Sequence, residues 1–324
     1  MNVPPPDLRR RVARFFRERP RLHAAAHPPY LYLRRLLRRR ELGRHGTVRD
    51  ARGGNAILRA AILSGAPHGI AKIGSLEAEA LTCFLGQSGY SPLLMEQLVT
   101  NVGLFPGTSD SIDRFCASYL AALEHIDLLA VWGQPGEAEI LSRAPAAFTA
   151  SPRELLHIDS FEPWYHDAPW SGALAGKRVV VLHPFAATME RQYARRREIW
   201  GDRGILPDCE LRTVRMPLSP ALVPSMFGHW QDQFDHLVGE IESRPYDVVI
   251  AGAGGISLLV AARACAQGKV GFHMGGLTQI LFGILGRRWD KSAFIMAQRN
   301  AAWVRPSGEE APATTRKVEQ GCYW

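Results

Sequence analysis

The segment from Asp247 to Trp289 constrains the fold of this chain more than any other part of the sequence. A short apolar run, DVVIA, is followed by a glycine turn, a helical stretch, a second apolar run and another glycine turn. Apolar runs without polar alternation are typical of parallel strands that are covered on both faces. The pattern predicts an α/β fold with a Rossmann-like, mostly parallel sheet in the C-terminal half.

Glycines mark the ends of both predicted strands. Gly252, Gly254 and Gly255 follow the first strand, and Gly275 and Gly276 follow the second. Residues without a Cβ allow a sharp turn and let a ligand approach the backbone closely. The free N–H groups of a following helix would also attract a phosphate. The alternative interpretation is that these glycines serve only the tight connection from strand to helix.

A dinucleotide site would require the pattern GxGxxG and an acidic residue about 20 positions later. The first turn here has the sequence GAGGIS, and the next strand ends in FHM without a carboxylate. We therefore expect no NAD, and no haem is expected either.

Three regions follow from the remaining sequence. Residues 1–52 are an arginine-rich arm, residues 53–176 are mainly helical, and residues 177–324 are the Rossmann-like, nucleotide-binding part with a C-terminal tail. In the middle region apolar residues recur at a spacing near 3.6, and prolines separate the periodic stretches.

The arm carries 15 arginines and four acidic residues, a surplus of eleven positive charges in a chain whose net charge is +8. Arg34, Arg35, Arg38 and Arg39 lie among tyrosines and leucines, so this stretch could form a basic amphipathic helix that contacts an anionic membrane or an acidic partner. A solvated helix without a partner explains the same pattern, because arginine outnumbers lysine throughout the chain. Nucleic acid is not expected as a partner, since no recognisable nucleic-acid-binding module is present.

The expected location is the cytoplasm. The five cysteines are scattered without the spacing of a disulfide framework or a zinc site. The N-terminus lacks the apolar core of a secretory signal, and no apolar run is long enough to span a bilayer. The arm remains a candidate for peripheral contact with the inner face of the membrane.

Two more segments contain candidate site residues. In IAKIGSLEAEAL, Glu77 lies at a predicted helix start near the cation of Lys72, although glutamate in a first turn is also common because it complements the helix dipole. In VVVLHPFAAT, His183 ends a predicted strand, at the edge where open α/β sheets bind ligands. Its imidazole could donate to a phosphate or move a proton, or serve only the structure.

In this order, the segments resemble the GT-D type of bacterial glycosyltransferase-like proteins, whose R-x-G-D-x-E signature precedes a Rossmann-like region. The matching residues are Lys72, Gly74, Ser75 and Glu77 in KIGSLE. Similar segments of proteins from bacterial surface-polysaccharide settings match LHPFAATMERQY, LPDCELRTVRMP, DVVIAGAG, GKVGFHMGGLTQILFGILGRRW and VEQGCYW. The resemblance covers Asn55 to Trp324, and GGLTQILFG is its most specific part.

The resemblance implies a transferase of the hexosyltransferase type that moves a sugar from a nucleotide sugar to a glycan, polysaccharide or lipid-linked glycan acceptor. Lys72 stands where the signature has arginine, and Ser75 stands where it has aspartate. Glu77 is then the remaining carboxylate of the signature. Mn²⁺ or Mg²⁺ could still be held by Glu77 together with phosphates and water, or the reaction could proceed without a metal.

These considerations assign candidate roles. Glu77 is the candidate metal ligand or sugar-orienting carboxylate, and His183 is the candidate base. The candidate nucleotide-sugar-binding residues are Lys72, Gly74, Ser75, Gly252, Gly254, Gly255, Gly275, Gly276, Gln279, Arg287 and Trp289, with Arg288 beside them. The assignment requires the helical front part and the sheet-forming rear part to close on each other.

Two alternatives remain open. A non-catalytic protein that binds a nucleotide sugar or glycan, or that serves assembly, would keep the same fold, and the serine at position 75 favours it. A nucleotide-dependent enzyme of another class, such as a dehydrogenase, is the second alternative.

Overall fold

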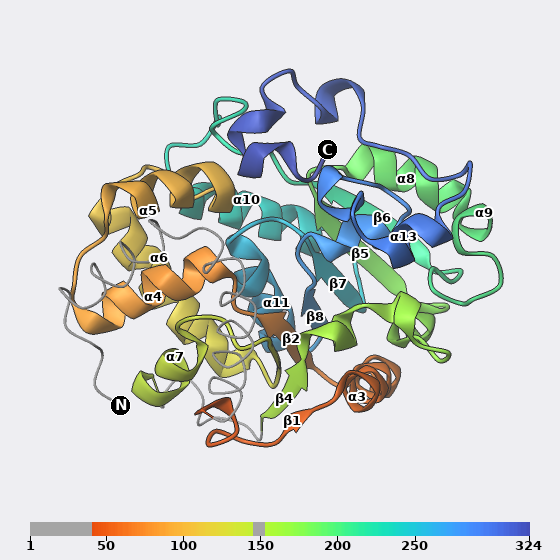
Figure 1. Cartoon of the computed structure of the whole chain (residues 1–324), viewed down its shortest axis with the longest axis horizontal. Coiled ribbons are helices and arrows are strands. Elements are labelled where there is room, and N and C mark those ends of the chain that lie inside the picture. Colours follow the sequence, from red (N-terminus) through yellow and green to blue (C-terminus); the bar gives the residue numbers. More distant parts are fainter. Residues whose placement is uncertain (1–40, 145–152) are drawn as a thin grey trace, which may run out of the picture.

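The computed structural model describes residues 41–144 and 153–324. Within these residues, eight parallel strands form one sheet in the order β1-β4-β3-β2-β8-β7-β5-β6 (Figure 1). The strands are β1 (Val48–Arg49), β2 (His68–Lys72), β3 (Leu128–Val131), β4 (Glu154–His157), β5 (Arg178–His183), β6 (Glu210–Arg215), β7 (Val248–Ala251) and β8 (Val270–His273). The predicted α/β fold with a mostly parallel sheet is confirmed.

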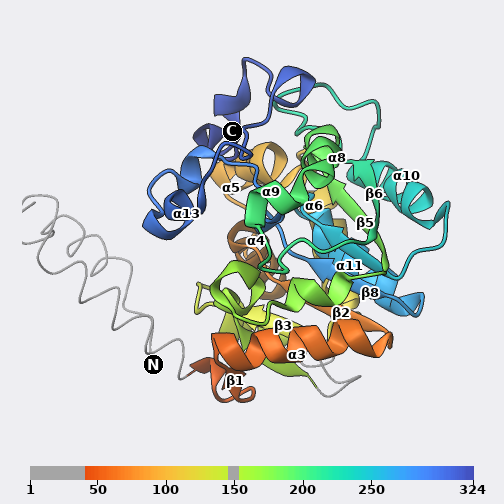
Figure 2. The same cartoon turned by 90° about the vertical axis from the view of Figure 1, so that its right-hand side faces the viewer.

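Helices connect the strands and cover both faces of the sheet (Figures 1 and 2). The α-helices are α3 (Ala51–Ser64), α4 (Ser75–Gly86), α5 (Pro92–Gln97), α6 (Ser109–Ala122), α7 (Glu137–Arg143), α8 (Ala186–Ala194), α9 (Arg196–Trp200), α10 (Trp230–Glu242), α11 (Ile256–Ala266), α12 (Leu277–Leu281) and α13 (Ala293–Gln298). Shorter helical turns are η1 (Leu98–Val102), η2 (Leu123–His125), η4 (Ile158–Phe161), η5 (Pro163–Tyr165), η6 (Trp170–Leu174), η7 (Arg287–Trp289), η8 (Gly308–Glu310), η9 (Thr315–Lys317) and η10 (Glu319–Gly321).

All three regions that the sequence suggests contribute strands to the sheet. Strand β1 lies within residues 1–52, and the part predicted to be mainly helical contributes β2, β3 and β4 between its helices. The register His68↔Val270, Gly69↔Gly271 and Ile70↔Phe272 joins β2 to β8 and so unites the front and rear parts in one sheet. The arginines of the predicted amphipathic helix, Arg34 to Arg39, lie outside the described residues.

The connections after neighbouring strands leave the sheet on opposite faces. After β2 and β7 the chain passes to one face, where α4 and α11 pack together with α6, α7 and α10 in one hydrophobic cluster. After β5 and β8 it passes to the other face, where α8 and α12 belong to a second cluster with α3. In the order β2-β8-β7-β5 the exit face therefore alternates at every step. Neighbouring strands whose connections diverge in this way open a crevice at their carboxyl ends.

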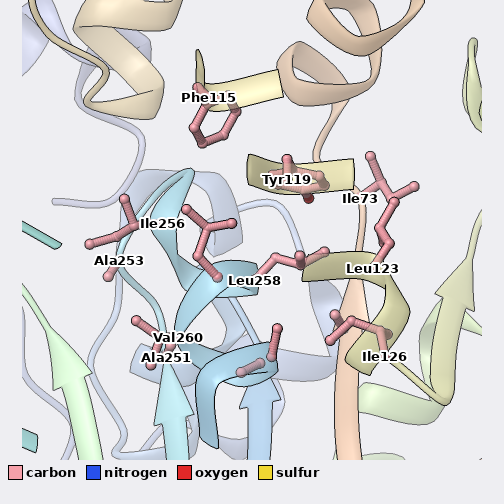
Figure 3. Close-up of a cluster of buried hydrophobic side chains, with 14 of the residues drawn as sticks. Ile73, Phe115, Tyr119, Leu123, Ile126, Ala251, Ala253, Ile256, Leu258 and Val260 are labelled. Carbon is pink, nitrogen blue, oxygen red and sulfur yellow. The ribbon is translucent and has the colours of Figure 1, made fainter. Parts of the chain in front are cut away.

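The first cluster is built mainly from aliphatic side chains around α11, with a few aromatic rings such as Phe115, Tyr119 and Trp230. Ile256, Leu258 and Val260 of this helix belong to it together with Tyr119 of α6, Ala251 of β7 and neighbouring apolar residues (Figure 3). Helix α11 is apolar on nearly all sides, as expected of a helix enclosed between a sheet and an outer helix layer.

The second cluster is rich in aromatic rings. The indole rings of Trp164 and Trp200 stack with their centroids 6.0 Å apart. Phe272 of β8 contacts Phe161 edge to face at 4.6 Å and also packs against Trp170. These rings hold the η4, η5 and η6 turns, which carry the chain from β4 to β5, against the sheet.

Several element boundaries differ from the sequence-based expectation. From Lys177 onward the sequence pattern alternates between strands and helices, which predicts helices over residues 188–200 and 224–243. The second of these begins only at Trp230, and the first is divided into α8 and α9 at Arg195. In the described residues no helix has both the length and the apolar character that a membrane crossing requires.

Two glycines provide a test of the packing between α11 and β8. A Cβ at Gly271 would lie 2.1 Å from the carbonyl oxygen of Ala261, whereas a Cβ at Gly239, on an exposed part of α10, would meet no atom within 4 Å. We expect Gly271→Ala to lower the free energy of unfolding by about 1–3 kcal/mol or more. Gly239→Ala should raise it by about 0.5–1 kcal/mol. Urea denaturation measures both changes, and equal stability of the Gly271 variant and the unsubstituted protein would contradict this packing.

Candidate functional site

A cavity of about 570 Å³ lies at the carboxyl end of the sheet. Residues that directly follow or end β2, β3, β5, β6, β7 and β8 line it, and the loop after β4 and the C-terminal segment complete the wall. The volume lies in the range of small-molecule sites. KIGSLE, the first glycine turn and the second glycine turn therefore meet at one cavity, as the closure of the front and rear parts requires.

The segment KIGSLE forms the connection from β2 to α4. Lys72 is the last residue of β2, Gly74 precedes the helix, and Glu77 lies in its first turn. The Glu77 carboxylate is turned back towards Gly74, since a Cβ at that position would lie 2.0 Å from one of its oxygens. Gly74 is thus the residue that allows the carboxylate to occupy this place.

The charges of Lys72 and Glu77, both in the cavity wall, affect each other's pKa. Burial lowers the pKa of Lys72, and the negative charge of Glu77 partly opposes this effect. Burial likewise raises the pKa of Glu77, and the ammonium of Lys72 opposes it. Burial raises the pKa of the Tyr119 hydroxyl well above its usual value, and the negative charge of Glu77 adds to this effect. No carboxylate of the described residues lies within 4.0 Å of the Lys72 ammonium, so this cation can still attract a bound anion.

The side chain of Ser75 points to the loop that follows the neighbouring strand β3. Its hydroxyl donates to Oε1 of Gln134 at 2.8 Å, and the Gln134 amide donates to the Ile73 carbonyl at 2.6 Å. The carboxylate of Glu137 accepts from the backbone N–H of Gln134 at 2.9 Å and of Trp132 at 3.3 Å. The serine therefore ties α4 to the hydrogen-bonded loop after β3.

The first glycine turn is held mainly by contacts inside the protein. The N–H of Gly252 donates to the Leu182 carbonyl, that of Ala253 to the Ser257 hydroxyl, and that of Gly255 to the Val102 carbonyl. A Cβ at Gly254 would lie 2.6 Å from the Val102 carbonyl oxygen. These bonds favour the structural interpretation for Gly254 and Gly255, because three amides of the turn are not free to cradle a phosphate.

Gly252 has a different part in the site. A Cβ there would lie 2.6 Å from the His183 ring, 2.7 Å from the Gly275 carbonyl oxygen and 2.9 Å from the Thr278 hydroxyl. The ends of β5, β7 and β8 therefore converge on this position, where only a glycine fits.

The second glycine turn lies under the C-terminal segment. A Cβ at Gly275 would lie 3.4 Å from the Lys72 ammonium nitrogen, and one at Gly276 would lie 2.7 Å from the Tyr323 ring. Gln279 donates to the carbonyls of Ile284 and Tyr323, both at 3.1 Å. These contacts place the cation of Lys72 beside the turn and lock the C-terminal segment onto α12.

His183 is buried at the end of β5 and lines the cavity. Its Nδ1 accepts a hydrogen bond from the backbone N–H of Phe185 at 3.0 Å. Burial lowers the pKa of His183 to about 3, so the ring is neutral at physiological pH. An imidazole whose Nδ1 is an acceptor carries its hydrogen on Nε2, and His183 is therefore placed as a hydrogen-bond donor.

Of the two arginines after α12, the structure places the second at the cavity. Arg287, the predicted binding residue, is exposed and does not line the cavity, whereas Arg288 and Trp289 do. The Arg288 guanidinium lies 5.3 Å from the Trp289 ring centroid and 5.2 Å from that of Tyr323. Both rings hold this cation at the cavity wall.

The cavity is also lined by residues that were not singled out in the sequence, among them Trp132, Glu162, His273 and Glu319. The Trp132 ring centroid lies 5.9 Å from the Lys72 ammonium. His273 is buried beside Lys72, which helps burial to lower its pKa, and its Nδ1 has no hydrogen-bond partner among the described residues. Trp132 and His273 follow or end strands, and this signal could have identified them once β3 was recognised.

The C-terminal segment forms the outer wall. Glu319 and Gln320 have φ values of 43° and 57°, in the left-handed region that residues with a Cβ rarely adopt. Upstream, the buried carboxylate of Glu310 accepts from the amides of Ala187 and Thr188 and from the Thr188 hydroxyl, so it caps α8. The Glu310 carbonyl in turn accepts from the indole of Trp324.

The residues near Glu77 do not fit a resident divalent metal. Nowhere in the described part of the chain do three His, Cys, Asp or Glu side chains come together as ligands. Glu77 is turned towards Gly74 and interacts with the Lys72 ammonium, whose positive charge would repel a metal ion bound there.

Comparison with family models, curated proteins and solved structures finds no match to this chain.

The cap on α8 can be tested with two adjacent glutamates. Glu310→Ala leaves the buried amide and hydroxyl of Thr188 and the partly buried amide of Ala187 without their acceptor, and an unpaired buried donor costs about 1–3 kcal/mol. Glu309 is exposed and forms a surface ion pair with Arg215, so Glu309→Ala should change the free energy of unfolding by less than about 1 kcal/mol. Chemical denaturation of both variants distinguishes the two costs. Similar losses in both would show that Glu310 does not anchor the C-terminal segment.

Proposed function

We propose that this protein is a glycosyltransferase that moves a sugar from a nucleotide sugar to a hydroxyl of a glycan or lipid-linked glycan acceptor. The observation that carries the proposal is the cavity at the crevice between β2 and β8. It contains the cations of Lys72 and Arg288 within a wall of aromatic rings. Open α/β sheets bind nucleotides at such crevices.

The two cations suit a diphosphate. Lys72 reaches the second glycine turn from β2, and Arg288 reaches the same turn from the chain after α12, since a Cβ at Gly276 would lie 3.2 Å from its guanidinium. Cations that converge from two elements would bind the diphosphate of the donor and stabilise the negative charge that develops on it as it leaves.

The aromatic rings suit the uncharged parts of the donor. Trp132 lies at the cavity rim with 43% of its surface exposed, and Trp289 and Tyr323 line the wall on the Arg288 side. Aromatic faces stack on nucleobases and also pack against sugar rings. We place the donor between these two groups of rings.

Glu77 and His183 would orient the sugar. The Glu77 carboxylate is a hydrogen-bond acceptor for a sugar hydroxyl, and it acts without a metal in this proposal. His183 would donate through Nε2 to a phosphate or hydroxyl oxygen, because Nδ1 is engaged by the Phe185 amide. At Gly252 the ligand could approach the backbone closely, because no side chain is in the way. The Gly252 amide itself would not bind the ligand, because it donates to the Leu182 carbonyl.

A non-catalytic nucleotide-sugar or glycan-binding protein is the second candidate. The hydrogen bond from Ser75 to Gln134 favours it, because the position at which the resembling family has an aspartate is used here to hold two loops together. Release or transfer of sugar from a panel of nucleotide sugars by the purified protein would distinguish the enzyme from the binding protein.

Neighbouring arginines provide the test of the diphosphate site. Arg288→Met removes a charge-assisted contact worth about 1.5–3 kcal/mol, so the dissociation constant of a nucleoside diphosphate should rise roughly 10- to 100-fold. Arg287→Met should leave it nearly unchanged, because Arg287 is exposed outside the cavity. Calorimetry with UDP, GDP and ADP, with and without Mn²⁺, measures the constants, and Lys72→Met is a second variant at the site.

The same panel includes NAD as a comparison. A ligand at 100 times its dissociation constant adds about 2.7 kcal/mol of stability, which a melting experiment detects. Stabilisation by NAD rather than by a nucleoside diphosphate would favour a dehydrogenase. Equal weakening by both arginine variants would show that the cavity is not the diphosphate site.

A further inference from the structure

Glu162 brings a second carboxylate to the cavity, from the opposite face of the sheet. It lies between η4 and η5, whose residues Phe161 and Trp164 belong to the aromatic cluster. Glu77, in contrast, begins α4, which packs in the aliphatic cluster. Both side chains line the same cavity, so the two layers each supply a carboxylate to its wall.

One neighbouring residue holds the Glu162 carboxylate by a hydrogen bond, and the nearby cation is engaged elsewhere. One carboxylate oxygen accepts from the indole N–H of Trp164 at 3.1 Å. The Arg203 guanidinium, the cation of the neighbouring loop, is directed to the Trp164 carbonyl and to Gln298. No ion pair to Glu162 occurs among the residues that the structure describes, so its second oxygen is available to a ligand.

We infer that Glu162 is the general base that removes the proton of the acceptor hydroxyl in the sugar transfer. This inference rests on the proposed function and names the catalytic group that the function requires. His183 is not available for that role while its Nδ1 accepts from the Phe185 amide.

The step balances in the following way. The proton of the acceptor hydroxyl passes to an oxygen of the Glu162 carboxylate, and the acceptor oxygen forms a bond to the anomeric carbon of the donor sugar. The bond between that carbon and the diphosphate oxygen breaks, and its electron pair stays on the diphosphate. Lys72 and Arg288 stabilise the resulting charge.

The acidity of Glu162 agrees with this role. Burial, with a further contribution from the negative charge of Asp159 on η4, raises its pKa to about 7, and the Trp164 indole opposes the rise. The other titratable groups near Glu162 are Tyr165 on η5 and His157, whose Nδ1 lies 3.4 Å from the carboxylate of Asp159. A base with a pKa near the working pH combines a populated basic form with useful proton affinity.

The test is the pH dependence of turnover with a nucleotide sugar that the protein uses. Turnover of the unsubstituted protein should rise about tenfold per pH unit below pH 7 and level off above it, because the ionised carboxylate is the active form. Glu162→Gln should lower turnover by roughly 100- to 10,000-fold and remove this acid limb. The dissociation constant of the nucleoside diphosphate should stay within about twofold, which also shows that the variant is folded.

Two companion variants separate catalysis from a structural effect. Asp159→Asn removes the negative charge that adds to the effect of burial on the Glu162 pKa, so the acid limb should move to somewhat lower pH while turnover on the plateau persists. Asp167→Asn, at an exposed position outside the cavity wall, should leave the profile unchanged.

Each result has a defined meaning. An acid limb that persists in Glu162→Gln, or one that disappears in Glu319→Gln instead, would overturn the role of Glu162 and leave the transferase function standing. Diphosphate binding without transfer to any acceptor by the unsubstituted protein would overturn both.

Discussion

The parallel pairing of β2 with β8 is the constraint on which the cavity depends. It joins a strand from the front of the chain to one from the rear, in a register that ends β2 at Lys72 and β8 at His273. The two strands then send their connections to opposite faces, which leaves the space between them open. Without this pairing the cation of Lys72 would not reach the second glycine turn, and Glu77 would belong to a separate surface.

Much of the rear half could be predicted from the sequence because its strands are continuous apolar runs that end at glycines. β7 and β8 are of this kind, and β5 is a similar apolar run that ends at His183 and Pro184 instead. The strand HGIAK was not recognised, because a histidine and a lysine bound only three apolar residues and the run is too short to differ from a loop. The closure of the front and rear parts came from the resemblance to a family, and no periodicity in the sequence specifies which strands become neighbours.

The candidate site was predictable where a side chain follows a recognised strand, and less so where tertiary packing decides. His183 is such a residue, whereas Lys72 and Glu77, which also reach the cavity, were singled out from the segment KIGSLE and its resemblance to a family signature, without recognition of β2. The choice of Arg288 over Arg287 depends on a 3₁₀ turn whose rotation the sequence does not fix. Glu162 follows a strand that was not recognised. The bonds of the first glycine turn depend on Val102, 150 positions before Gly252, so the sequence could not distinguish a structural turn from a phosphate cradle.

The alternation of exit faces along β2, β8, β7 and β5 has a consequence for the whole molecule. The cavity lies over the middle of the sheet, and the aliphatic and the aromatic layers each contribute part of its wall. A molecule bound there bridges the two layers, so its binding energy adds to the cohesion of the entire sheet rather than of one half. Occupancy would therefore make the front and rear parts unfold as a single cooperative unit.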